Sequence, residues 1–79
     1  MKEKNQLTNI ENKIYNLILS ECLNNNICIL SNEEIAKKCN CSISSVAHSI
    51  SLLKKEKFIK LVKFDGRTRK LQVRVAKEN

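Results

Sequence analysis

Along the first 56 residues, apolar positions recur every three or four residues, which is the spacing of one buried face of an α-helix. This pattern predicts three helices, at about residues 9–23, 32–39 and 43–56. Sequences typical of capping boxes begin at Thr8 and Ser31, immediately before the first two segments. The second and third segments are separated by a very short connection, as in a helix-turn-helix.

After residue 57 the apolar pattern changes to that of β-structure. The segment Phe58–Phe64 is β-prone, and Leu71, Val73 and Val75 alternate with polar residues, as in a strand with one buried face. Asp65-Gly66 lies between these segments and is a strong signal for a two-residue turn, because glycine adopts positive φ at low cost. The C-terminal third of the chain is therefore predicted to be a β-hairpin.

The length and order of these elements predict one small α+β domain spanning residues 1–79, with residues 1–7 as a polar N-terminal tail. The apolar run Ile27–Leu30 predicts a brief strand between the first two helices. The N-terminus lacks the apolar region of a signal peptide, and no apolar run approaches the ~20 residues of a membrane span. We therefore expect a cytoplasmic protein with no membrane partner.

Charge is distributed very unevenly. Residues 1–53 carry five Lys or Arg and five Asp or Glu, whereas residues 54–79 carry ten and three, so the whole net charge of +7 lies in the last third. Lysine and arginine gain free energy by displacing counterions from phosphates. A neutral helical body followed by a cationic hairpin is typical of a module that binds a polyanion.

The order of elements resembles the winged helix-turn-helix family from about residue 8 to residue 76. The family pattern of apolar and small positions is matched in the second helix, in the turn and in the third helix by Ile35, Ala36, Cys39, Cys41, Val46, Ile50 and Leu53. Asn40 stands where the family usually has glycine in the turn. The resemblance implies three helices with a C-terminal β-hairpin wing.

In that family the third helix enters the DNA major groove and the wing reaches the flanking backbone or minor groove. By position, the resemblance implies groove-facing residues Ser42, Ile43, Ser44, Ser45, Ala47, His48 and Ser51. It implies wing contacts from Lys63, Arg67, Thr68, Arg69 and Lys70. Lys54 and Lys55 are further candidates for phosphate contacts, although cations at a helix C-terminus also complement the helix dipole without any ligand.

The third helix departs from the family picture because its first turns hold serine and alanine rather than the arginine, asparagine or glutamine that read bases. One interpretation is that serine hydroxyls and the helix N-terminus contact phosphates with modest specificity. The other is that this small-residue face packs against a second copy. In that respect the chain resembles small partition adaptors of the TubR kind. These dimerise through the recognition helix, bind centromere repeats and couple them to a tubulin-like filament protein.

The remaining chemistry-bearing residues indicate no catalytic or metal site. Cys22, Cys28, Cys39 and Cys41 lack the paired C-x-x-C spacing of structural zinc sites, and Cys28, Cys39 and Cys41 fall at apolar positions, where we expect them to act as small apolar residues. His48 is the only histidine. No nucleophile–base pattern or glycine-rich phosphate loop is present, so we expect neither an enzyme nor a cofactor.

These observations predict a homodimeric protein that binds double-stranded DNA. It would serve either as a small transcriptional regulator or as a plasmid or phage segregation or replication adaptor. An adaptor would have a filament-forming NTPase or a replication protein as its partner. The alternative is a winged helix used only for protein–protein contacts, against which the concentration of +7 charge in one segment speaks.

Overall fold

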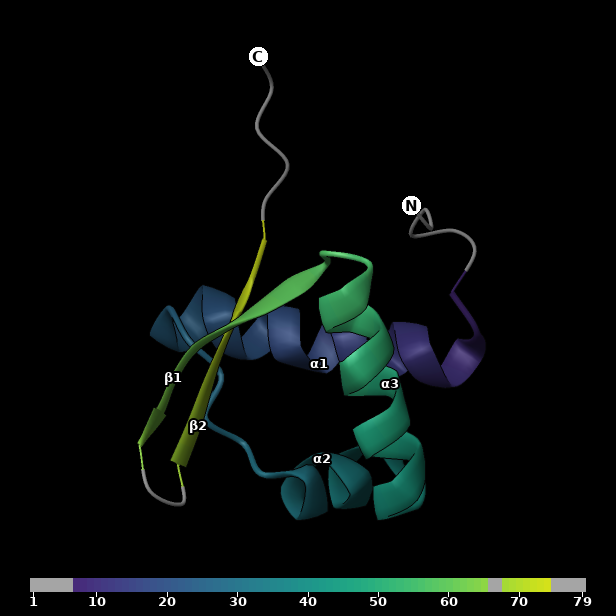
Figure 1. The fold of residues 1–79 in the computed structure, drawn as a ribbon. Helices are drawn as coiled ribbons and strands as arrows, with labels where there is room; N and C mark the ends of the chain where they lie inside the picture. Colours follow the sequence, from purple (N-terminus) through teal and green to yellow (C-terminus); the bar gives the residue numbers. More distant parts are fainter. Residues whose placement is uncertain (1–6, 66–67, 75–79) are drawn as a thin grey trace.

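The computed structural model describes residues 7–65 and 68–74, apart from the side chains of residues 64, 65 and 68 (Figure 1). Within these residues it has the elements α1 (Asn9–Asn25), α2 (Asn32–Cys39), α3 (Ile43–Lys55), β1 (Ile59–Asp65) and β2 (Thr68–Val73). The fold is α+β, with three helices followed by an antiparallel hairpin, a layout compatible with a winged helix-turn-helix. No helix in the described part is long and apolar enough to cross a membrane.

Local side-chain chemistry starts the helices where the sequence predicts. The Thr8 hydroxyl accepts a hydrogen bond from the Glu11 amide at 3.2 Å, and the Glu11 carboxylate accepts one from the Thr8 amide at 3.0 Å. Ser31 and Glu34 make the same reciprocal pair at 3.2 and 2.9 Å. Each pair satisfies two of the amides that a helix start leaves without partners, so both predicted capping boxes are confirmed.

Residues with left-handed backbone conformations end the helices. α1 runs two residues beyond the predicted end and closes at Asn26, with φ 71°. Asn40 closes α2 at φ 56° and ψ 51°, a left-handed conformation that asparagine tolerates. At the end of α3, Lys57 has φ 66°. The Phe58 amide bonds back to the Leu53 carbonyl at 2.9 Å, and the Lys57 amide to Lys54 at 3.1 Å.

The hairpin contains one irregularity that changes which side chains share a face. Leu61 pairs with Leu71, but the next pair is Lys63 with Lys70, so Val62 is an extra residue in β1. Such a bulge interrupts the alternation of side chains along a strand. Lys63 therefore lies opposite Lys70 on the outer face instead of following Leu61.

The limits of the hairpin differ from the prediction. Asp65, predicted as the first residue of the turn, is the last residue of β1 and pairs with Thr68. β2 begins three residues before the predicted strand and ends at Val73. Gly66, Arg67 and Val75 lie outside the described residues. The brief strand predicted at 27–30 is a single bridge, in which Cys28 and Leu71 exchange hydrogen bonds of 2.8 and 2.9 Å.

The core lies between α1, which crosses behind the other elements, and the layer formed by α2, α3 and the hairpin (Figure 1). Each element contributes fully buried apolar side chains, the largest being Ile14, Ile18, Ile35, Val46, Leu53, Ile59 and Leu71. The Tyr15 ring on α1 meets the Phe58 ring edge-on, with the centroids 5.8 Å apart. Leu7 was assigned to the polar tail but is only 7% exposed, so the packed chain begins one residue earlier than predicted.

The predicted role of the cysteines as small apolar residues is confirmed for Cys28 and Cys39, which are buried in the core. Burial raises the pKa of both thiols. All four cysteines are free thiols, and among the described residues no three of His, Cys, Asp and Glu come together as a group that could hold a metal ion.

Candidate nucleic-acid interface

The N-terminus of α3 is capped by its own serines. The Ser42 hydroxyl accepts a hydrogen bond from the Ser45 amide at 3.1 Å and donates one to the Ser45 hydroxyl at 2.9 Å. These two predicted contact residues therefore already bond to each other on the surface of the protein. Ser44 is exposed beside them and points away from the core.

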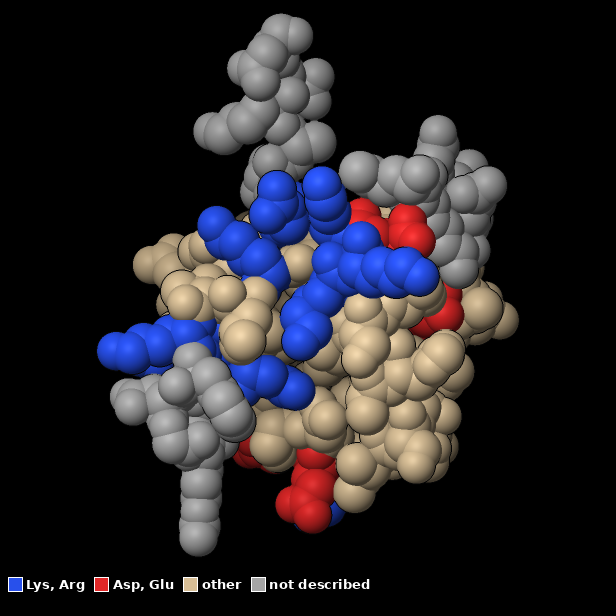
Figure 2. Space-filling model, in the orientation of Figure 1, with Lys and Arg blue, Asp and Glu red and all other residues tan. Residues whose placement is uncertain are grey.

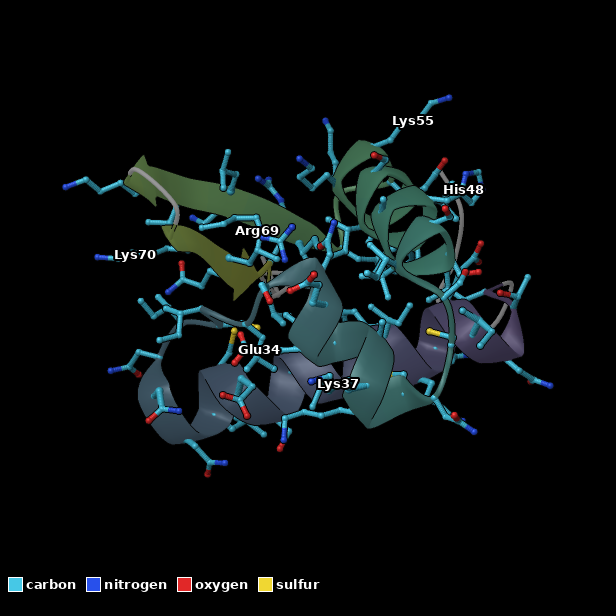
Figure 3. All side chains as sticks on the ribbon, turned by 90° about the horizontal axis from the view of Figure 1, so that it is seen from below. Glu34, Lys37, His48, Lys55, Arg69 and Lys70 are labelled. Atoms are coloured by element: carbon cyan, nitrogen blue, oxygen red, sulfur yellow. The ribbon has the colours of Figure 1, made fainter. Side chains whose placement is uncertain are left out.

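One side of α3 is exposed along its whole length. It begins with Ser44, Ala47 and His48, continues with Ser51, and ends with Lys54 and Lys55. In Figure 3, His48 and Lys55 extend from the same side of this helix. The opposite side carries the buried residues Val46, Ser49, Ile50 and Leu53. Ser49 is 2% exposed and is thereby excluded from any surface contact.

The outer face of the hairpin continues this surface. Lys60 and Lys63 are exposed, and Lys70 is half-buried opposite Lys63. The bulge at Val62 is what places Lys63 on this face. Figure 2 shows lysine and arginine gathered over the hairpin and the C-terminal end of α3, next to an uncharged area over the N-terminal half of α3.

The carboxylates that are visible in this view lie at the margins of the surface (Figure 2). Exposed Glu33 and Glu34 lie in the first turn of α2, where they complement the helix dipole. α3 carries no acidic residue. The surface formed by the exposed side of α3 and the outer face of the hairpin is called here the α3–hairpin face.

Arg69 differs from the other predicted contacts because its side chain is turned inward. Its Nη1 donates to the Asn32 Oδ1 at 2.7 Å and its Nη2 donates to the Leu30 carbonyl at 2.9 Å. Figure 3 shows it against the body of the protein, whereas the neighbouring Lys70 extends outward. Burial lowers the pKa of Arg69 below its ordinary value, an effect that the nearby Cys28 thiol partly opposes.

The inward direction of the Arg69 side chain could have been predicted from the alternation of side chains along β2. Residues 69, 71 and 73 have the same parity, and Leu71 and Val73 are buried. An arginine two residues before a buried leucine in a regular strand belongs to the inner face. Of the other predicted wing contacts, Arg67 lies outside the described residues, and for Thr68 only the backbone is described.

The structure thus exposes most of the predicted contact residues of α3 and places Lys63 and Lys70 on the outer face of the hairpin, whereas Arg69 is turned inward. No protein-family model, curated protein or solved structure matches this chain. The chemistry of its own surface is therefore the basis for assigning a function.

Proposed function

We propose that this chain is a non-enzymatic winged helix-turn-helix protein that binds double-stranded DNA as a homodimer through the α3–hairpin face. The observation that supports this most directly is the spatial continuity of the exposed side of α3 with a group of lysines. Exposed Lys54 and Lys55 end α3, and Lys60, Lys63 and Lys70 lie on the outer face of the hairpin; Figure 2 shows lysine and arginine gathered from the hairpin to this end of α3. Fixed cations beside an uncharged helix surface suit a duplex, because phosphates flank the groove that the helix enters.

In this arrangement the lysines supply most of the affinity for DNA, and α3 fixes the position of the protein along the duplex. Serine hydroxyls can donate hydrogen bonds to bases or phosphates, and can accept them from bases. They do not form the bidentate base contacts that arginine and asparagine make. We therefore expect modest discrimination among DNA sequences from α3, with strong dependence of the affinity on salt.

A salt titration tests the proposal. Fluorescence anisotropy with a labelled duplex measures the dissociation constant at each ionic strength. Lys57 is also exposed and follows the end of α3. With it, six phosphate contacts, one for each of Lys54, Lys55, Lys57, Lys60, Lys63 and Lys70, would weaken binding by about 10³-fold between about 50 and 200 mM salt. A response to salt that is nearly flat contradicts DNA binding through this face.

Single neutral substitutions locate the contacts. Lys63→Gln is expected to reduce the slope of log affinity against log salt by about 0.9, because one phosphate contact is lost. Lys37→Gln is the matched control. Lys37 is an exposed lysine on α2, away from the side of α3 that carries His48 and Lys55 (Figure 3). Equal changes for the two variants would mean that binding depends on total charge and not on the α3–hairpin face.

Two biological roles fit this proposal, a small transcriptional regulator and a segregation or replication adaptor that couples DNA to a partner protein. They differ in whether α3 is free or paired in the dimer. The exposed, uncharged Ala47 and Ser51 favour an α3 that another helix can approach closely, as in the adaptor.

A further inference from the structure

The hairpin is attached to the helical body by contacts at different distances from its tip. Near its base, the Gln72 Nε2 donates to the Asn26 carbonyl at 3.2 Å. The Cys28–Leu71 bridge lies further along. Closer to the tip, among the described residues, the hydrogen bonds with the helical body are those of Arg69.

We propose that Arg69 is a positioning residue that holds the outer part of the hairpin at a fixed angle to α2 and α3, and that it does not itself contact DNA. This inference rests on the proposed DNA-binding function. The two anchors of the guanidinium, the side chain of Asn32 and the carbonyl of Leu30, lie in the segment that leads into α2. One side chain thus links the hairpin directly to the helix-turn-helix.

The planar guanidinium is suited to this role. Its two terminal nitrogens reach two acceptors that are two residues apart in the chain, at 2.7 and 2.9 Å. Lysine presents a single ammonium group on a flexible stem and lacks the rigid fork of donors. The half-buried position also leaves the Arg69 Nε with no partner in the described part of the structure. An arginine poised for phosphate would instead present its donors to solvent.

The consequence for DNA concerns Lys63 and Lys70, whose pair lies between the Cys28–Leu71 bridge and the pair that contains Arg69. A two-stranded hairpin without further support is at best marginally ordered in water. When the hairpin is anchored, these two lysines are presented together on the α3–hairpin face before DNA arrives. When it is not, binding has to order them first, and affinity falls although both lysines remain.

Three variants test the inference. Arg69→Lys retains the charge but cannot make both bonds. Asn32→Ala removes one acceptor without changing charge, and it leaves the helix cap intact because Ser31 is the N-cap. Gln72→Ala is the matched control, since it removes another side-chain hydrogen bond between hairpin and body, at the base of the hairpin. Each variant is assayed below its own melting temperature for duplex binding by anisotropy and for backbone hydrogen exchange without DNA.

If Arg69 positions the hairpin, Arg69→Lys and Asn32→Ala each weaken duplex binding on the order of tenfold, and Gln72→Ala stays within about twofold. The double variant Arg69→Lys/Asn32→Ala is then no weaker than the worse single variant, because both changes break the same link. In the free protein, the amides of the Lys63–Lys70 pair lose protection in the first two variants only.

Opposite results would overturn the inference. If Arg69 contacts phosphate directly, Asn32→Ala frees it and leaves affinity unchanged or tighter, while Arg69→Lys binds nearly as the natural chain does. Unchanged hydrogen exchange in both variants would show that the contact does not hold the hairpin. The exchange experiment needs no DNA, so it tests the positioning role even if the natural chain fails to bind a duplex and the proposed function is wrong.

Discussion

Replacing Ser51 by leucine tests whether α3 is the surface through which two copies meet. Ser51 is exposed on α3, one turn before Lys55. In a monomer, a leucine at this position projects into solvent, and we expect the free energy of unfolding to change by no more than about 0.5 kcal/mol. Any larger effect of the substitution on self-association then reports on an interface.

The magnitude follows from the symmetry of a dimer. An isologous interface contains the same residue twice. Overpacking of a close helix–helix contact costs about 1–3 kcal/mol for each inserted side chain. Two leucines would then weaken a dimer that meets through α3 by about 2–6 kcal/mol, which is about 30-fold to 10⁴-fold in the dissociation constant.

Sedimentation equilibrium without DNA measures this constant for the natural chain, for Ser51→Leu and for Ser20→Leu. Ser20 is an exposed serine on α1, so its replacement is the same chemical change on a different helix. Ser49→Leu is unsuitable as a probe, because the buried Ser49 lies among core residues and leucine would destabilise the monomer itself. A Ser51→Leu dimer of unchanged strength would refute α3-mediated association and favour the regulator over the adaptor.

Three further predictions concern stability. Because burial raises the pKa of Cys28 and Cys39, the unfolded chain ionises these thiols first, so stability should fall as the pH rises above about 8.5; equal urea midpoints at pH values of about 7.5 and 10 would contradict this. Asn40→Ala should cost about 1–2 kcal/mol at the left-handed position and lower the melting temperature, whereas Asn40→Gly should not; circular dichroism melts compare the two. Chelators should leave the melting temperature unchanged, and one equivalent of tightly bound zinc in the purified protein would show that the cysteines had been misinterpreted.

The helices and their order could be predicted from sequence because their signals are local. Caps at Thr8 and Ser31, and apolar spacing within each segment, involve residues that are close in the chain. The direction of the Arg69 side chain could not be derived from charge alone. An arginine in a basic hairpin matches the family's wing contacts, yet its partners at positions 30 and 32 are nearly 40 residues away in the chain.

The bulge at Val62 could not be predicted from the sequence, for a different reason. Nothing in the run Lys60-Leu61-Val62-Lys63 marks the extra residue, which is defined only by the pairing with β2. Uninterrupted alternation would have put Lys63 on the same side as Leu61. The candidate interface was therefore predictable in its residue types, whereas which of them share a face depended on strand register.

The connection between α3 and β1 has an exposed lysine at a position where glycine would give a more stable fold. Lys57 occupies the left-handed position that closes the helix, where residues with a Cβ are disfavoured by about 1 kcal/mol or more relative to glycine. Glycine there would give a more stable protein but one exposed cation fewer beside the lysines at the end of α3. Under the proposed function, Lys57 contributes to DNA affinity at a position where glycine would contribute more to stability. Substitutions of Lys57 that raise the melting temperature should therefore weaken the binding of DNA.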